Sequence, residues 1–440
     1  MSHSHQLSLL GKRRFLPFFT TQFLGAFNDN IYKNTLLLMA AFAAAEQLPF
    51  DSDLFINLGA GLFILPFFIF SGIAGQMADK YEKSLIIRRV KLLEIAIMAV
   101  AAGFIISQNF LVLLILLFLM GTQSAFFGPV KYAIIPQHLH DDELVGGNAL
   151  VEMGTFVAIL LGTLGAGLLV ELPQAHEWIA VSVVVLAIIG WLCARQVPEA
   201  KASAPELEVS YNLFSQTRKI MRDAHGDKTV YMSLVAISWF WAIGAAYLTQ
   251  LPNLASQILA GSPQVVSIML AMFTIGVAAG SLFCGRISHG KVEPGIVPLG
   301  AFGLSLFALD LFFAISPNTQ GTLLSVSEFI RIPANVRVLF DLAMIGFFGG
   351  LFIVPLYAMV QKRTDESRRA RMIAALNVMN SSYMVGSAVF GMLFLGVANR
   401  TIEEFFLTLA VLHVIVSLLI FRTSPEFWQR FRVRFSRQVS

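Results

Sequence analysis

Apolar runs of about 20 residues recur along the whole of this 440-residue chain. An α-helix needs a run of about that length to cross the hydrocarbon core of a bilayer. Only 13% of the residues are charged, against about 25% in soluble domains. The pattern predicts an all-α membrane protein that crosses the bilayer many times.

Twelve segments fit such spans, six before and six after a polar central stretch. We therefore expect two pseudo-symmetric six-helix bundles at 1–196 and 229–422, joined by a cytoplasmic linker at 197–228 and followed by a basic-aromatic tail at 423–440. The predicted spans are 15–44, 55–78, 85–107, 110–133, 145–171, 177–196, 229–257, 264–288, 293–315, 334–361, 369–397 and 402–422.

Lys and Arg are unevenly divided between the two sets of connections. They gather in the even-numbered connections and the tails, and of 31 only Arg331, Arg337 and Arg400 lie on or near the other side. Basic residues are retained on the cytoplasmic side of a membrane. This asymmetry predicts that both termini are cytoplasmic.

Two polar segments carry apolar residues in a regular pattern. Within the linker, Leu213, Phe214, Ile220 and Met221 recur at helical spacing among basic residues, which predicts an amphipathic helix on the inner membrane face. In the tail, Phe and Trp alternate with Arg. Such a pattern can bind nucleic acid, but directly after a span it favours an anchor to anionic membrane lipid.

The first span contains charges that lipid would not tolerate. Its stretch QFLGAFNDNIYKN, from Gln22 to Asn34, places Asp29 and Lys33 on one stripe with Asn30 beside it. An ionised Asp at the centre of a membrane helix costs roughly 2.5–3.5 kcal/mol. We expect this stripe to line a water-accessible cavity.

The fifth span has a similar polar stripe, formed by Asn148, Glu152 and Thr155. We expect it to face the same cavity, with Lys131 of the fourth span as the cationic partner. The alternative is a structural ion-pair network of Asp29, Lys33, Lys131 and Glu152. Glu94 lies near a basic cluster and is interpreted as structural, whereas Asp310, Arg337 and Asp341 receive no assignment.

Polar candidates in the second half are uncharged. Tyr247 and Asn377 lie among the aromatic residues Trp239, Phe240 and Trp241 and further amides. One charged wall and one aromatic wall suit an amphiphilic substrate better than a sugar or an ion. We hypothesise that a phosphate-bearing head group meets Lys33 or Lys131 while an acyl chain lies towards the second half.

Between the second and third spans, Gly75, Ala78, Asp79, Lys80 and Lys83 form the pattern G-x-x-A-D-K-x-x-K. It resembles the loop signature of the major facilitator superfamily, although Glu82 and Lys83 replace the usual second glycine and final arginine. The resemblance implies the major facilitator fold and a breakable cytosolic latch built from Gly75, Asp79 and Lys80. The alternative is a plain charged turn.

A longer set of residues resembles one branch of that superfamily, the bacterial lysophospholipid transporter family, including the transporter module fused to some acyltransferases. The set comprises FLGAFNDN in the first span, GGLFIVPLYAMVQ at 349–361, and a block from the fourth and fifth spans: Pro129, Lys131, Tyr132, Leu144, Val145, Asn148, Leu150, Glu152, Thr155, Ala158, Ile159, Leu160, Leu161 and Gly162. One departure concerns the seventh span, where the family has an arginine and this chain has only Ala245, Ala246, Tyr247 and Leu248.

The resemblance implies transport of lysophosphatidylethanolamine or lysophosphatidylglycerol across the bacterial inner membrane by alternating access. A separate acyltransferase partner would restore the second acyl chain, since we expect no such domain in a chain that ends at Ser440. We expect no enzyme activity, cofactor, metal or nucleic-acid partner, because no nucleophile–base pair or metal-ligand spacing is visible. The alternatives are a cation-coupled exporter of amphipathic compounds and a non-transporting scaffold for an acyltransferase.

Overall fold

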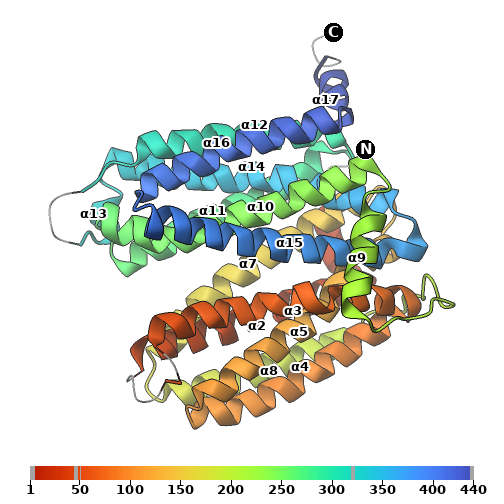
Figure 1. Cartoon of the computed structure of the whole chain (residues 1–440), viewed down its shortest axis with the longest axis horizontal. Helices are drawn as coiled ribbons and strands as arrows, with labels where there is room; N and C mark the ends of the chain where they lie inside the picture. The colour runs from red at the N-terminus through yellow and green to blue at the C-terminus, as the bar shows by residue number, and fades with distance from the viewer. Residues whose placement is uncertain (1–4, 44–47, 50, 319–322, 437–440) are drawn as a thin grey trace. The chain divides into compact units, whose positions relative to one another are not determined.

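The computed structural model of the chain describes residues 5–43, 48–49, 51–318 and 323–436 (Figure 1). Within them, twelve helices of at least 18 residues account for all twelve predicted spans. The predicted all-α fold is therefore confirmed. The long helices are α2 (Leu16–Phe42), α3 (Ser52–Lys80), α4 (Lys83–Ile106), α5 (Phe110–Ala133), α7 (Leu144–Val170), α8 (Ala175–Ala194), α10 (Lys228–Asn253), α11 (Pro263–Ile287), α12 (Val297–Ala314), α14 (Pro333–Arg363), α15 (Arg369–Gly391) and α16 (Ile402–Thr423).

Shorter helices connect these spans. Single π-helical turns, η3 (Leu254–Ile258) and η6 (Met392–Val397), continue α10 and α15, so the predicted ends at 257 and 397 fall within them. The other short elements are α1 (His5–Ser8), η1 (Leu9–Gly11), α6 (Ile135–His138), α9 (Leu213–Ala224), η4 (Pro294–Ile296), α13 (Val326–Phe329), η5 (Glu366–Arg368) and α17 (Glu426–Ser436).

Helix starts follow local capping chemistry. The side chains of Glu82, Asn109 and Asp227 accept hydrogen bonds from the first free backbone N–H groups of α4, α5 and α10. Thr401 and Glu404 form a capping box at the start of α16. These polar residues fix where each apolar helix begins.

Two of the twelve long helices differ in polarity from the rest. Ten segments of the described chain are long and apolar enough to cross a membrane, and α2 and α4 are not among them. Helix α4 carries five charged residues, including Lys91 and Glu94, whereas α2 combines Asp29 and Lys33 with three asparagines, which lower its mean hydropathy. The charged helices are thus the ones to search for a functional site.

The chain divides into two compact units. Unit 1 comprises Met1–Asp141, Val157–Gly226 and Arg363–Ser381, and unit 2 comprises Asp142–Phe156, Asp227–Lys362 and Ser382–Ser440. Helices α7 and α15 therefore each contribute one part to each unit. The bundle boundaries at 196 and 229 stay a prediction.

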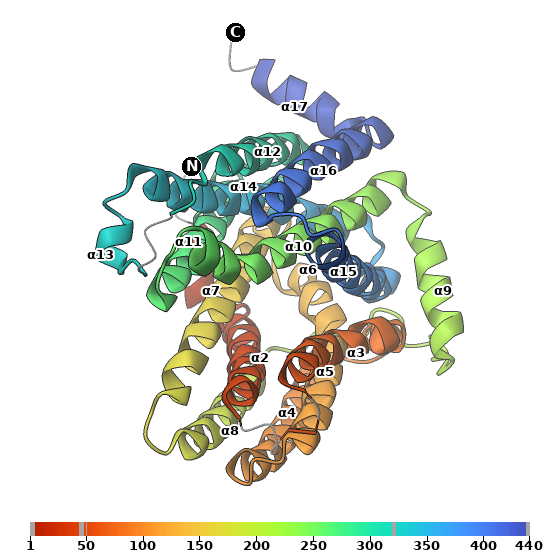
Figure 2. The same cartoon turned by 60° about the vertical axis from the view of Figure 1, so that its left-hand side comes forward.

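In unit 1, α3 packs on α5, and α8 packs on both α2 and α4 (Figures 1 and 2). Helix α9 packs against α3, where Gly72 leaves room for the backbone of Thr217. Of the residues expected to face lipid from α9, Ile220 is instead buried against protein, whereas Phe214 is 86% exposed. Only part of the apolar face is therefore available to a membrane.

In unit 2, α11 and α14 approach so closely that a Cβ atom on Gly280 would lie 1.8 Å from the carbonyl oxygen of Phe347. The C-terminal helix α17 packs against η4 and α12. Phe427 is fully buried there, while Trp428 stacks on Phe431 with 43% of its surface exposed. The described part of the tail is thus folded onto unit 2.

Candidate functional site

A buried ion pair joins the charged helices of unit 1. On α4, Lys91 donates to Glu94 at 2.6 Å, and both residues are 1% exposed. The same carboxylate accepts hydrogen bonds from the amides of Asn28 on α2, at 3.0 Å, and Gln123 on α5, at 3.1 Å. These three donors compensate a charge that would otherwise be very costly to bury.

Asp29 adjoins this pair through one hydroxyl group. Ser124 Oγ lies 2.8 Å from Asp29 Oδ2 and 3.0 Å from Gln123 Oε1. A hydroxyl has a single proton, so Ser124 can donate to only one of these two acceptors at a time. The other oxygen of Asp29 is buried and accepts no hydrogen bond from the described residues.

Asn30, Lys33 and Lys131, the other predicted site residues of this part of unit 1, make contacts near their own positions. Lys33 Nζ donates to Asn30 Oδ1 at 3.3 Å and lies 5.6 Å from the ring centre of Phe63. Asn30 in turn donates to the carbonyl of Ala26. Lys131, near the end of α5, lies 5.0 Å from the ring centre of Tyr132.

The structure shows how Glu94 is held. The sequence interprets Glu94 as structural, near a basic cluster, and the structure pairs it with Lys91 of that cluster and with two amides beside Asp29. The role of Lys131 as cationic partner stays a prediction. A signal of the pairing was present, because Lys91 and Glu94 are three residues apart and so share one helix face. Gly25 of α2 leaves room for this pair, since a Cβ atom there would lie 2.2 Å from Lys91 Nζ.

Unit 2 holds three predicted site residues, and each is buried. Asn148 and Gln361 exchange two amide hydrogen bonds, of 2.7 and 2.9 Å, and neither is exposed. Glu152 lies one turn further along α7 and is also 0% exposed. Tyr247 packs on Phe406 with ring centres 4.9 Å apart, and its hydroxyl has no hydrogen-bond partner among the described residues.

Aromatic rings near Tyr247 in the sequence form a stack. Trp241 of α10 lies parallel to Phe156 of α7, with ring centres 5.3 Å apart and planes 7° apart. Its indole N–H donates to the hydroxyl of Tyr357 at 3.1 Å. Aromatic side chains thus gather around Trp241, and Glu152, one turn before Phe156 on α7, is a charged residue of the same unit. The division into a charged wall and an aromatic wall stays a prediction.

Asn377 belongs to unit 1, together with the first part of α15. Its amide lies against Gly128 of α5, where a Cβ atom would approach the amide nitrogen to 2.6 Å. That nitrogen has no hydrogen-bond acceptor among the described residues. Asn377 thus has a buried amide donor that is unpaired within the described part of the chain.

Asp79 of the loop motif binds the first turn of α15. The carboxylate of Asp79 accepts hydrogen bonds from the backbone N–H groups of Ala370 and Arg371, and from Arg371 Nε at 2.9 Å. The free N–H groups of a helix start attract an anion. Gly75 is needed beside them, because a Cβ atom there would lie 2.6 Å from that of Ala374, whereas Lys80 extends over the ring of Tyr81.

The two departures from the motif bind the linker. Glu82 accepts a hydrogen bond from the N–H of Ala200, and Lys83 Nζ donates to Ser203 Oγ at 2.9 Å. The backbone carbonyl of Asp79 accepts from the N–H groups of Ser203 and Ala204. The first part of the linker, from Ala200 to Ala204, is therefore bound to the α3–α4 turn, and we call this segment the strap.

Glu82 shows the electrostatic effect of this strap. Burial by itself would raise the pKa of Glu82. Hydrogen bonds from Ala200, from Ser84 and from the backbone N–H of Leu85 outweigh burial and hold the pKa below its usual range. Glu82 therefore remains ionised at neutral pH and keeps the strap in place.

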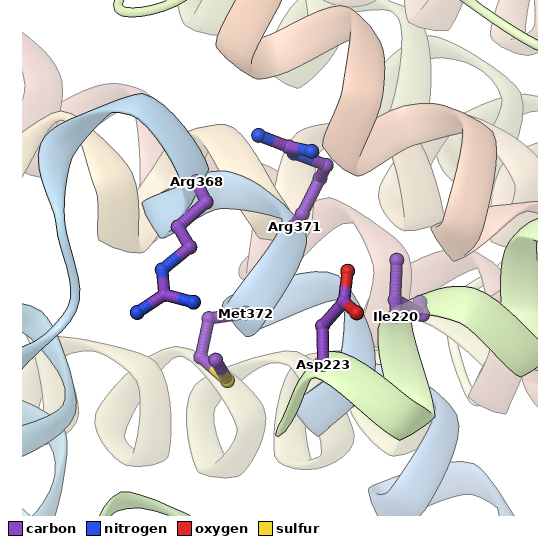
Figure 3. A pocket seen from close by; sticks show the side chains of 5 residues that line it. All are labelled: Ile220, Asp223, Arg368, Arg371 and Met372. Carbon is purple, nitrogen blue, oxygen red and sulfur yellow. The ribbon is translucent and has the colours of Figure 1, made fainter. Parts of the chain in front are cut away.

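A pocket opens beside the Asp79 contact, between α9 and the start of α15 (Figure 3). Arg368 of η5 and Arg371 of α15 line it on one side, and Asp223 and Ile220 of α9 on the other. Arg368 also pairs with Asp365 at 3.0 Å. The linker helix thus lies next to the residues that hold Asp79.

We expect Asp79→Asn to loosen the start of α15. The variant loses the charge that Arg371 and two backbone N–H groups face, and hydrogen bonds to a charged group contribute about 1.5–3 kcal/mol each. Hydrogen exchange at Ala370 and Arg371, measured by mass spectrometry, should be at least about tenfold faster. Asp365→Asn is the matched control, because that carboxylate is exposed, and unchanged exchange in Asp79→Asn would contradict the expectation.

Taken together, the long helices and the buried charges define a multi-pass α-helical membrane protein whose interior holds polar groups. Comparison with known proteins is more specific. The family model described as Major Facilitator Superfamily matches residues 18–331 and 251–433, so the chain belongs to that superfamily.

Relatives and solved structures agree with this membership. Lysophospholipid transporter LplT of Cronobacter sakazakii is 26% identical over 370 residues, covering 81% of this chain and 82% of the relative. The protein of the same name from Escherichia fergusonii is 28% identical, covering 83% and 84%. The expected resemblance to this transporter family is thereby confirmed.

Two solved structures share the fold. The proton:xylose symporter XylE superposes with a TM-score of 0.72 at 11% identity, covering 95% of this chain and 96% of that structure. The human organic anion transporter MFSD10 gives 0.67 at 15% identity, covering 92% and 99%. At these identities the likeness concerns the fold alone.

Proposed function

We propose that this protein is a lysophospholipid transporter that moves lysophosphatidylethanolamine or lysophosphatidylglycerol across the bacterial inner membrane by alternating access. The observation that carries the proposal is the match to lysophospholipid transporters along about four fifths of the chain. The charged network of unit 1 and the aromatic stack of unit 2 support it, because an amphiphile has both a charged and an apolar part.

The substrate-binding residues are assigned within each unit. In unit 1, Lys33 and Lys131 are the cations for a phosphate head group, and Asp29, Asn30 and Asn377 supply polar contacts. In unit 2, Asn148 and Glu152 add polar groups, whereas Tyr247 belongs to the aromatic surroundings of an acyl chain. The latch of Gly75, Asp79 and Lys80 would open and close during the cycle.

Several further properties belong to the same proposal. The protein makes and breaks no covalent bond, both termini are cytoplasmic, and transport runs from the outer to the inner leaflet. A separate acyltransferase then restores the second acyl chain. The charge asymmetry between the connections supports the orientation.

Uptake of labelled lysophospholipid by spheroplasts tests this function. We expect Asp29→Asn and Lys131→Ala each to lower the initial rate by about tenfold or more. A charge-assisted hydrogen bond contributes about 1.5–3 kcal/mol, and its loss lowers the binding constant for the substrate by about tenfold or more. Membrane levels of each variant are measured in parallel, so that loss of protein is not mistaken for loss of transport.

Matched controls are Glu208→Gln and Lys219→Ala, which remove exposed charges from the linker. Wild-type rates in both site variants would refute the site assignment and favour a scaffold. Export of amphipathic compounds in place of lysolipid uptake would favour the exporter alternative.

A further inference from the structure

Asp341 of α14 is a buried acid that receives no hydrogen bond. Its side chain is 0% exposed, and no N–H or O–H group of the described residues donates to either carboxylate oxygen. An ionised carboxylate without donors is among the costliest groups that a protein can bury. Asp341 must therefore be neutralised by something that it binds.

The neighbouring charges come from α12 and from the preceding turn of α14. The carboxyl group of Asp310 lies within hydrogen-bonding range of that of Asp341. Arg337 holds Asp310 in a two-pronged contact, with Nε 3.0 Å from Oδ2 and Nη2 on Oδ1. Since an arginine fork stabilises a carboxylate, the negative charge resides on Asp310.

Two carboxylates at hydrogen-bonding range repel each other when both are ionised, because neither can donate. A single shared proton turns the same contact into a hydrogen bond. The Arg337 fork favours the charge on Asp310, so the proton resides on Asp341, whose O–H then donates to Asp310. With one arginine, one carboxylate and one carboxylic acid, the net charge of the three groups is zero.

The helices packed against this group carry few other titratable residues. Asp310 is the sole ionisable residue of α12, and Cys284 and Arg286, the ionisable residues of α11, lie eight and ten residues beyond Gly276, which faces Ala343. On α16, which also packs against α12, His413 lies at the carbonyl of Ala301, more than two turns from Asp310. The first turn of α16 carries Glu403 and Glu404, and Glu404 is bound by the N–H of Thr401 and paired with Arg400. On α13, Glu328 is bonded to Ser325.

We propose that Asp341, Asp310 and Arg337 form a proton-binding site that fastens α12 to α14. The two helices lie side by side in both views (Figures 1 and 2) and already touch through Phe307 and Phe340, whose ring centres are 5.8 Å apart. Loss of the proton would set two anions against each other at this contact. The site thus makes the contact between α12 and α14 of unit 2 sensitive to pH, and it uses none of the charged residues of unit 1.

The test uses the purified full-length protein in detergent, over a pH series from about 5 to 9. Infrared difference spectra record the carbonyl band of a protonated carboxylic acid, and the melting temperature is measured in the same samples. In the wild type we expect this band at neutral pH, its loss as the pH rises, and a melting temperature that falls by a few degrees in parallel.

Asp341→Asn should remove the band and flatten the pH dependence, because its amide N–H can donate to Asp310 without titrating. The matched control Glu208→Gln, which removes an exposed carboxyl group, should retain both signals. If Asp341→Asn does not fold, Asp310→Asn serves instead. It removes the repelling charge and should shift the loss of the band to lower pH.

Two outcomes would overturn the proposal. One is that the band and the melting temperature of the wild type do not change with pH. The same holds if they change with pH but the Asp341 and Asp310 variants show the same change. The other is a band that is absent in sodium but present in choline at equal ionic strength, since Asp341 would then bind a metal cation rather than a proton.

Discussion

Glu94→Leu should destabilise the protein by about 3–5 kcal/mol, the cost of leaving a buried charge without its partner. Lys91 is 1% exposed and donates to Glu94 at 2.6 Å, so the variant leaves an ammonium group in the interior of unit 1. The amides of Asn28 and Gln123 lose their acceptor in the same step. We expect a much lower melting temperature in detergent and little protein in the membrane.

A double variant separates the charge from the packing. Lys91→Met combined with Glu94→Leu removes both charges and should regain most of the lost stability, because paired apolar side chains can replace a buried ion pair. The matched control is Asp365→Ala, which breaks another pair at the same three-residue spacing, with Arg368. That pair is exposed, so the change should stay below about 1 kcal/mol. A single variant as stable as the double would contradict this account of the network.

Gly280→Ala should prevent α11 and α14 from packing. The added Cβ atom would lie 1.8 Å from the carbonyl oxygen of Phe347, and a Cβ atom on Gly276, one turn earlier, would lie 2.0 Å from the carbonyl oxygen of Ala343. A backbone atom cannot move aside as a flexible side chain can, so the helices must separate. We expect a loss of about 3 kcal/mol or more, seen as a lower melting temperature and aggregation on purification.

Gly244→Ala is the matched control for this prediction. Gly244 lies inside α10 of the same unit, and a Cβ atom there meets nothing within 4 Å. Alanine is a better helix former than glycine by about 1 kcal/mol, so this variant should be neutral or slightly stabilised. Equal melting temperatures for the two alanine variants would show that the α11–α14 contact tolerates separation.

Much of the fold followed from local patterns in the sequence. Each of the twelve predicted spans is a helix, because the length of an apolar run is set by the thickness of the bilayer rather than by distant residues. The small-residue spacing of Gly276 with Gly280, and of Gly346 with Gly350, is likewise visible in the sequence. The sequence does not show which helices these glycines bring together.

The candidate site was predictable only in part. The sequence identified Asp29 as an acid that lipid would not tolerate, and its family resemblance placed Asp79 in a cytosolic latch. It did not identify Ser124 as the donor to Asp29 or Arg371 as the partner of Asp79. Those partners lie 95 and 292 residues away along the chain, beyond the reach of any helical periodicity.

Glu82 and Lys83 show the same limit. In the sequence they are departures from a family motif, whereas in the structure they hold the linker against the α3–α4 turn. Asp341 received no assignment from the sequence, because the role of a buried acid depends on which charged groups face it, and these are known only from the structure.

The sequence by itself determined the class of protein, the number and limits of the membrane helices, and the family to which the chain belongs. Only the tertiary structure decided which charge meets which partner. The physical reason is one of range, since hydropathy and helical period act over a few turns, whereas a hydrogen bond or ion pair requires two side chains within about 3 Å. That separation is set by the rotation and packing of whole helices.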